Sequence, residues 1–175
     1  MMKSNKTKGL VIFVALCFFF KYSFAQQNQP APTYPNVVGF FAVLVPVGTL
    51  DNKGYTANFS KRSVIGIPFG LNLLKSEHIG YSLEMVPFIS AQNGSSRMEY
   101  MVFHPGVMFR YSHDFTFIPR LAFQTDGRYG FTPVFSKVII RQKNYYIYLS
   151  LSEAARFGNN LPSSYSTGLQ LGIGF

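Results

Sequence analysis

Apolar and polar residues alternate strictly along the last twelve residues of the chain, from Ser164 to Phe175. One face of this segment carries its aromatic and aliphatic side chains together with Thr167. The other face carries serine, glycine and Gln170. A period of two is typical of a half-buried β-strand. The pattern therefore predicts a strand over 164–175 that ends on an aromatic residue.

Segments with the same period, separated by turn signals such as Asn93-Gly94 and Asp126-Gly127, recur along the chain. The predicted strands are Asn36–Val47, Ser63–Leu74, Gly80–Ala91, Met98–Ser112, Phe115–Thr125, Gly130–Ile140, Asn144–Ser152 and Ser164–Phe175. Their number is even, as in single-chain bacterial barrels, and most are long enough to cross a bilayer when tilted. We therefore predict an all-β fold over 36–175: an eight-stranded antiparallel transmembrane β-barrel with up-and-down connections.

The N-terminus has the layout of a cleavable secretory signal. A lysine-containing region precedes an apolar run from Leu10 to Phe20, and Ser23-Phe-Ala25 forms a small-x-small cleavage site. The alternative is a membrane anchor helix, but Lys21 interrupts the run well short of the roughly 20 residues that a spanning helix needs. We predict a signal peptide over 1–25 and a short periplasmic segment over 26–35.

Cleavage would change both the charge and the cysteine content. It removes four of the sixteen basic residues and leaves a net charge of +5 in place of the formal +9. The remaining charges are dispersed, which argues against nucleic acid as a partner. The single cysteine, Cys17, would leave with the signal, so no disulfide or thiol chemistry is expected. No motif for a metal or another cofactor occurs, and none is expected.

A soluble β-sandwich also alternates, so the content of each face has to separate the two folds. The polar faces here are rich in glycine and serine, which suit the cramped interior of an eight-stranded barrel. Aromatic residues on the apolar faces fall near both ends of the strands, as in the girdles of membrane barrels. Prolines argue the other way, because proline cannot donate to a strand ladder. They lie inside six predicted strands, at Pro46, Pro68, Pro87, Pro105, Pro119 and Pro133.

With both termini in the periplasm, the two longest connections, Gly48–Arg62 and Glu153–Ser163, fall outside the cell. This is the arrangement expected of such barrels. Taken together, the chain resembles the small outer-membrane β-barrel families of Gram-negative bacteria, with an OmpX/OmpA-like plan and a likeness to the PorT-like barrel domain. The resemblance implies an assembly signal that the barrel-assembly machinery reads. Its residues here are Gly168, Leu171, Ile173 and Phe175, offset by two positions from the usual pattern and with aliphatic residues in aromatic places.

Charged and polar residues on the inward faces predict a structural network inside the barrel. Glu84, Arg110 and Arg120 lie on neighbouring predicted strands, and buried charges must be paired. His104 faces the same way, and we interpret it as a hydrogen-bonding residue of the interior.

Function is less determined than fold. Eight strands leave no aqueous channel, so the first hypothesis is a non-enzymatic barrel with a structural or surface-interaction role and no open pore. Basic residues at the external rim, Lys53, Lys61 and Arg62, are candidates for binding lipopolysaccharide phosphates, and solvated loop charge is the alternative. The second hypothesis is an accessory subunit of an envelope secretion or assembly complex. The third is an outer-membrane lipid-modifying enzyme or protease, for which no nucleophile motif is found; we expect no enzymatic activity.

Overall fold

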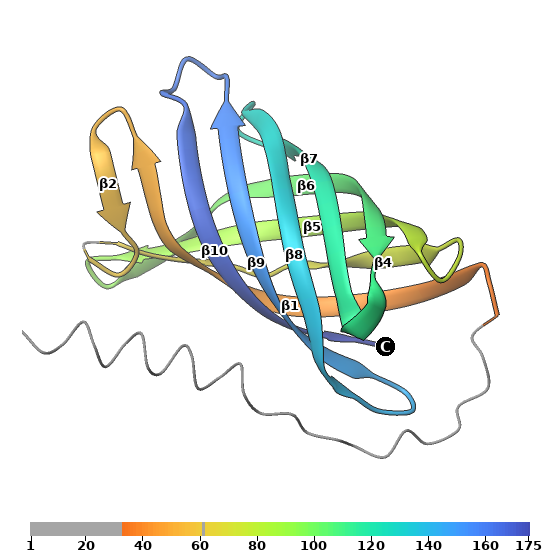
Figure 1. Ribbon diagram of the computed structural model, residues 1–175. Helices are drawn as coiled ribbons and strands as arrows, with labels where there is room; N and C mark the ends of the chain where they lie inside the picture. The colour runs from red at the N-terminus through yellow and green to blue at the C-terminus, as the bar shows by residue number, and fades with distance from the viewer. Residues whose placement is uncertain (1–32, 61) are drawn as a thin grey trace, which may run out of the picture. The chain divides into compact units, whose positions relative to one another are not determined.

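The computed structural model describes residues 33–60 and 62–175 (Figure 1). The predicted signal peptide lies outside the described residues, as do residues 26–32 of the predicted periplasmic segment. The described part of the chain holds no helix that is long and apolar enough to cross a membrane.

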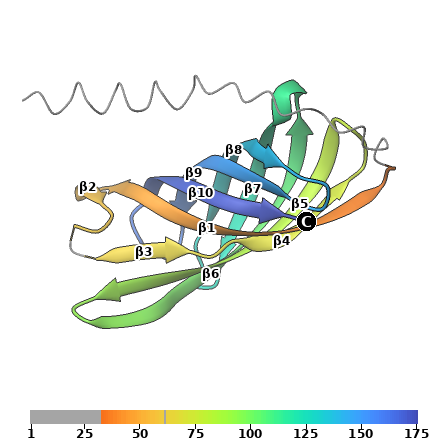
Figure 2. The same ribbon diagram turned by 90° about the horizontal axis from the view of Figure 1, so that it is seen from below.

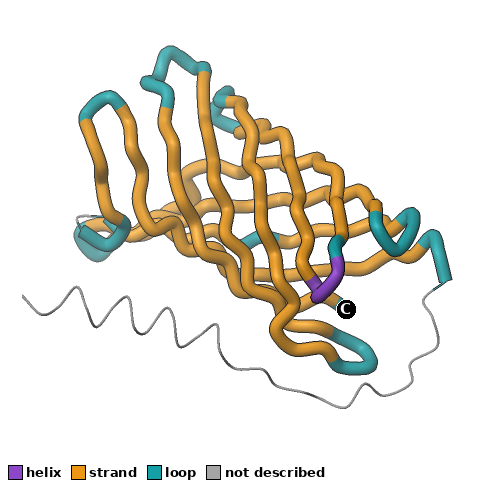
Figure 3. The backbone as a smooth tube through the Cα atoms, in the orientation of Figure 1, coloured by secondary structure: helices purple, strands orange, loops and turns teal. Residues whose placement is uncertain are grey.

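The described chain consists almost entirely of antiparallel strands in one sheet (Figure 3). The strands are β1 (Asn36–Asp51), β2 (Gly54–Ala57), β3 (Ser63–Gly66), β4 (Phe69–Leu74), β5 (Ile79–Gln92), β6 (Ser95–Arg110), β7 (Phe115–Gln124), β8 (Tyr129–Arg141), β9 (Tyr146–Phe157) and β10 (Ser164–Gly174). A 3-10 turn, η1 (Ser112–Asp114), joins β6 to β7.

The sheet closes on itself. Hydrogen bonds run from β1 through β4, β5, β6, β7, β8 and β9 to β10, and β10 pairs with β1 again, with Phe40 opposite Gly174. Figure 2 shows the C-terminus beside β1 where this closure occurs. Residues at the two edges thus satisfy each other's backbone groups. The sheet is a closed ring of eight strands and not the two separate layers of a sandwich.

The eight predicted strands correspond to the ring, with longer elements at several places. The second predicted strand is divided into β3 and β4 around Pro68. The predicted loop Gly48–Arg62 is wrong in part, because β1 continues to Asp51 and turns into β2. The predicted loop Glu153–Ser163 is likewise shorter, because β9 continues to Phe157. We call the end of the ring where β1 begins and β10 ends the terminal end. The turns after β1, β5, β7 and β9 lie at the opposite end, which we call the loop end.

The two faces of the ring have opposite chemistry. Large apolar side chains point outward and stay exposed along the middle of the strands, for example Leu71 at 54% and Phe135 at 52%. Polar and charged side chains are buried inside, for example Glu84 at 2% and Arg120 at 4%. This distribution is the reverse of that in soluble proteins, where Glu and Arg are almost never fully buried unless they are paired.

Glycines on the inward face make room for aromatic rings. A Cβ built on Gly172 would lie 2.3 Å from the Tyr148 ring, and one built on Gly174 would lie 2.2 Å from the Tyr146 ring. Both distances are far inside van der Waals contact. The alternating glycines of the last strand therefore serve the packing of β9 side chains, a role that the sequence pattern of small inward residues indicated.

Two of the six prolines lie at interruptions of the ladder, while the other four lie inside strands that continue through them: Pro87, Pro105, Pro119 and Pro133. The pairing of β1 with β10 shifts register between Pro46 and Gly48, and Pro68 occupies the break between β3 and β4. Asn58 takes the place of the missing ladder bonds near Pro46. Its Nδ2 donates to the carbonyls of Pro46 and Val64, and its Oδ1 accepts from the Val64 N–H, each at 2.8 Å. One side chain thus links β1 to β3.

Candidate functional site

The most highly charged part of the interior is a cluster centred on Glu84 of β5. The register places Glu84 opposite His104 of β6, and Arg120 of β7 lies opposite Gly106, two residues further along β6. Glu84 Oε1 accepts from His104 Nδ1 at 2.9 Å and from Arg120 Nη1 at 2.8 Å. Arg120 Nη2 also donates to Ser82 Oγ at 3.0 Å. The structure thus brings together three of the four residues for which the sequence predicted an interior network.

A second arginine completes the cluster from β9. With the proton on Nδ1 shared with Glu84, His104 Nε2 is an acceptor. It faces Arg156 Nη2 at 3.1 Å and Thr132 Oγ1 at 3.2 Å. Arg156 Nη1 further donates to the carbonyls of Phe131 and Ala155. Arg156 falls within the connection Glu153–Ser163 that the sequence predicted outside the cell, but β9 extends through it, and the residue is 6% exposed and points into the ring.

Arg110 does not join the cluster. Its Nη1 donates to the hydroxyl of Tyr34 at 3.3 Å, at the terminal end of the ring. The expected contact of Arg110 with Glu84 is wrong, for a simple reason of distance. Arg110 faces inward as predicted, but six residues of extended chain separate it from His104, which is about 20 Å along the strand.

The cluster lies between two apolar layers. On the loop side, Val86 and Val102 pack with Ala122; on the terminal side, Ile118 packs with Met108 and other residues of a second apolar group. These layers keep bulk water from the charges, so each ion pair is stronger than in solution and each unpaired charge is costlier.

The order carboxylate, imidazole, hydroxyl in Glu84, His104 and Thr132 is also that of a nucleophilic triad. Here the His104 Nε2 atom faces Arg156 as well as Thr132, and the Thr132 side chain is 4% exposed. A nucleophile needs access to its substrate. The geometry therefore suits ion pairing across β5, β6, β7 and β9. Among the described residues, no group of three or more His, Cys, Asp or Glu side chains could hold a metal ion.

Charged residues at the loop end form a smaller network. Glu99 lies where the pairing of β6 with β5 shifts register. Its carboxylate forms salt bridges with Arg62 Nη2 at 3.1 Å and with Arg97 Nε at 2.8 Å. The Ser90 hydroxyl donates to the same carboxylate.

The candidate lipopolysaccharide contacts are spread over this end. Arg62 is one of the two arginines that form salt bridges with Glu99. Lys53 lies in the exposed turn between β1 and β2, where its N–H donates to Asp51 Oδ1 at 2.8 Å. Lys61 lies outside the described residues.

The residues of the expected assembly signal lie on the closing strand. Leu171, Ile173 and Phe175 point outward, and Gly168 points inward. Phe175 exchanges two backbone hydrogen bonds with Gly39, both at 2.9 Å, so the last residue extends the closure of the ring. Its side chain is 66% exposed. Recognition by the assembly machinery stays a prediction.

Comparison with known proteins adds little to this geometry. No family model matches the chain, and no curated protein matches it. Among solved structures it is similar to the solution NMR structure of the de novo designed TMB2.3, at 14% identity over 76% of this chain and 93% of that one, with a TM-score of 0.34. A TM-score this low supports no inference about this chain. The class is defined by the sheet itself: an all-β protein whose antiparallel strands close into a ring of eight.

Proposed function

We propose that this chain is exported and folds as an eight-stranded transmembrane β-barrel in the outer membrane of a Gram-negative bacterium, with both termini in the periplasm. The observation that carries the proposal is the inverted chemistry of the ring. Its charges are buried and paired inside, while its mid-strand apolar side chains are exposed outside. A contiguous exposed apolar surface of this kind needs a cover, and a band around a closed ring fits the hydrocarbon core of a bilayer.

Aromatic side chains at the two ends of the strands support the same proposal. Those expected at the periplasmic interface are all exposed: Tyr81, Tyr111, Phe115, Tyr145 and Phe175. Those expected near the external interface are exposed too: Phe123, Phe131 and Tyr165. The longer strands add Tyr129 and Phe157, whose rings lie 6.4 Å apart at the loop end. Tyrosine favours the headgroup region because it joins an apolar ring to a polar hydroxyl, and girdles of aromatic residues flank the apolar band of membrane barrels.

The role that fits best is structural or interactive, without catalysis and without an open pore. The apolar layers and the charged cluster together fill the interior of the ring, as expected for the smallest barrels. The partners we propose are outer-membrane lipid, including lipopolysaccharide, and the barrel-assembly machinery. An accessory place in an envelope secretion or assembly complex is the second candidate, favoured by the extended hairpins at the loop end (Figure 1).

The direct test is gel migration of the protein extracted from membranes, with and without boiling. A closed hydrogen-bonded ring stays folded in detergent at room temperature and unfolds on boiling, because its eight strands pair with one another around the whole ring. We expect two distinct bands, the unboiled one migrating differently. Identical migration before and after boiling, for protein with intact β-sheet circular dichroism, would contradict the barrel.

The orientation has its own test on intact cells. A membrane-impermeant amine reagent should modify Lys53, which lies in an exposed turn at the loop end, and should spare Lys143, which lies in an exposed turn at the terminal end. The two lysines are matched in exposure and differ in the end of the ring that carries them. Peptide mapping reads the result, and permeabilised cells serve as the control in which both react. Modification of Lys143 alone would reverse the orientation.

A further inference from the structure

The loop end of the ring contains an open fork. Nearer the terminal end, β4 lies between β1 and β5 and pairs with both. Nearer the loop end, two short strands replace β4: β2 pairs with β1, and β3 pairs with β5. β3 pairs with β1 only at Leu44 opposite Gly66. β2 and β3 lie apart in Figure 2. We define the fork as the space between β2 and β3, with Asn58 at its base.

One side of the fork is a free strand edge. Thr56 and Gly54 face β1 in the ladder, and the Asn58 N–H donates to the Val47 carbonyl at 3.0 Å. Since backbone groups alternate in direction along a strand, those of Tyr55 and Ala57 point away from β1, into the fork. The Ser60 hydroxyl donates a hydrogen bond to the Ala57 carbonyl. Among residues 33–60 and 62–175, the Tyr55 N–H, the Tyr55 carbonyl and the Ala57 N–H have no hydrogen-bond partner, and they form a row of groups with strand spacing.

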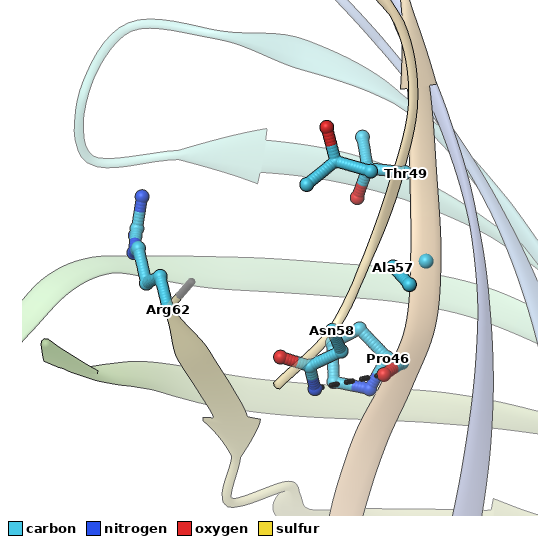
Figure 4. A pocket seen from close by; sticks show the side chains of 7 residues that line it. Pro46, Thr49, Ala57, Asn58 and Arg62 are labelled. Carbon is cyan, nitrogen blue, oxygen red and sulfur yellow. Dashed lines mark hydrogen bonds between the residues drawn. The ribbon is translucent and has the colours of Figure 1, made fainter. Parts of the chain in front are cut away.

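The side chains around the fork are mixed: Tyr55 and Phe59 are large and exposed, and the charged residues among the others carry a small positive excess. A pocket of about 80 Å³ opens at its base, lined by Pro46, Thr49, Thr56, Asn58 and Arg62 among others. In Figure 4, Arg62 lies across the pocket from Thr49 and Ala57. The described charges near the fork are three basic residues, Lys53, Arg62 and Arg97, against two acidic ones, Asp51 and Glu99, and both arginines share the one Glu99 carboxylate.

We propose that the fork is a docking site for an extended, acidic segment of a partner protein, which adds as a strand to the free edge of β2. A free edge recognises another backbone through main-chain hydrogen bonds. β2 and β3 both run antiparallel to β1, so an incoming strand that is antiparallel to β2 is antiparallel to β3 as well. This inference deepens the proposed surface-interaction role and rests on it in placing the fork in water outside the membrane.

The test uses protein purified from membranes in detergent and the fluorescent peptide Glu-Thr-Glu-Val-Glu-Thr-Glu. Fluorescence anisotropy should give saturable binding. The same peptide N-methylated at alternate residues cannot donate along one edge, and a peptide with lysine in place of glutamate reverses the charge. Each change should weaken binding about fivefold to tenfold or more.

The variant Ala57→Pro removes the outward N–H and leaves the β1 ladder bonds in place, because proline is tolerated at an edge strand whose N–H faces away from its neighbour. The variant should weaken the binding of the acidic peptide about fivefold to tenfold. Asn144→Pro, in the exposed turn between β8 and β9, is the matched control and should bind normally. Boiled and unboiled gel migration of each variant reports whether the ring itself is intact.

The outcomes separate the ideas. No saturable binding by the acidic peptide to a protein with normal heat-dependent migration overturns the docking site and leaves the barrel standing. Binding that survives both Ala57→Pro and N-methylation overturns strand addition. Equal binding of the lysine peptide overturns the acidic class of partner. Binding of purified lipopolysaccharide at the fork, lost in Arg62→Ala, with no peptide binding, assigns the site to lipid in place of protein. Loss of heat-dependent migration contradicts the proposed function itself.

Discussion

Glu84→Gln is expected to lower the free energy of unfolding by about 3–5 kcal/mol, because it leaves Arg120 as an uncompensated charge inside the ring. The glutamine keeps the shape of the side chain, so the loss measures charge and hydrogen bonding and not a cavity. Both Arg120 and His104 bind the same Glu84 oxygen, and apolar layers lie above and below. Urea unfolding of the protein in detergent micelles gives the measurement.

The control is Glu77→Gln, in the exposed turn between β4 and β5, which should change stability by no more than about 0.5 kcal/mol. The double variant Glu84→Leu with Arg120→Met removes both charges and should recover much of the loss, since apolar replacement of a whole buried pair is often neutral. Equal stability of Glu84→Gln and the original protein would remove the structural role of the cluster.

Leu169→Arg is expected to destabilise the protein by about 2–4 kcal/mol in a bilayer, since it places a charge near the middle of the lipid-facing band. Tyr165→Arg, on the same face of β10 and four residues nearer the loop end, should cost only about 0–1 kcal/mol, because an arginine there reaches the interface. The two side chains are equally exposed, at 48%, which makes them a matched pair. Unfolding of protein folded in lipid vesicles measures the difference.

A soluble surface gives a different result. Substitution of an exposed residue in water usually changes stability by about 0.5 kcal/mol or less, so both arginine variants should then behave alike. A large difference between Leu169→Arg and Tyr165→Arg supports the membrane. Equal small effects would return the chain to the class of soluble β-proteins.

For the candidate site, the sequence predicted which side chains point inward. It did not predict which of these side chains lie at the same height on neighbouring strands. Period two placed Glu84, His104, Arg110 and Arg120 on inward faces, and all four point away from the outer surface. Arg110 nevertheless lies too far from Glu84, because the register between strands fixes which inward residues meet. For Arg156 the signal was present: Ser150, Ser152, Ala154 and Arg156 share one face, but the predicted strand ended at Ser152.

The sequence alone determined the strand class, the eight segments of the ring, and the inward and outward faces, because each of these follows from local alternation and turn residues. Only the tertiary structure decided the register, which brings Arg156 to His104, and the fork, where Asn58 connects β1 to β3 beside Pro46. Both depend on which backbone groups of distant segments face each other, and local periodicity carries no information about such pairing.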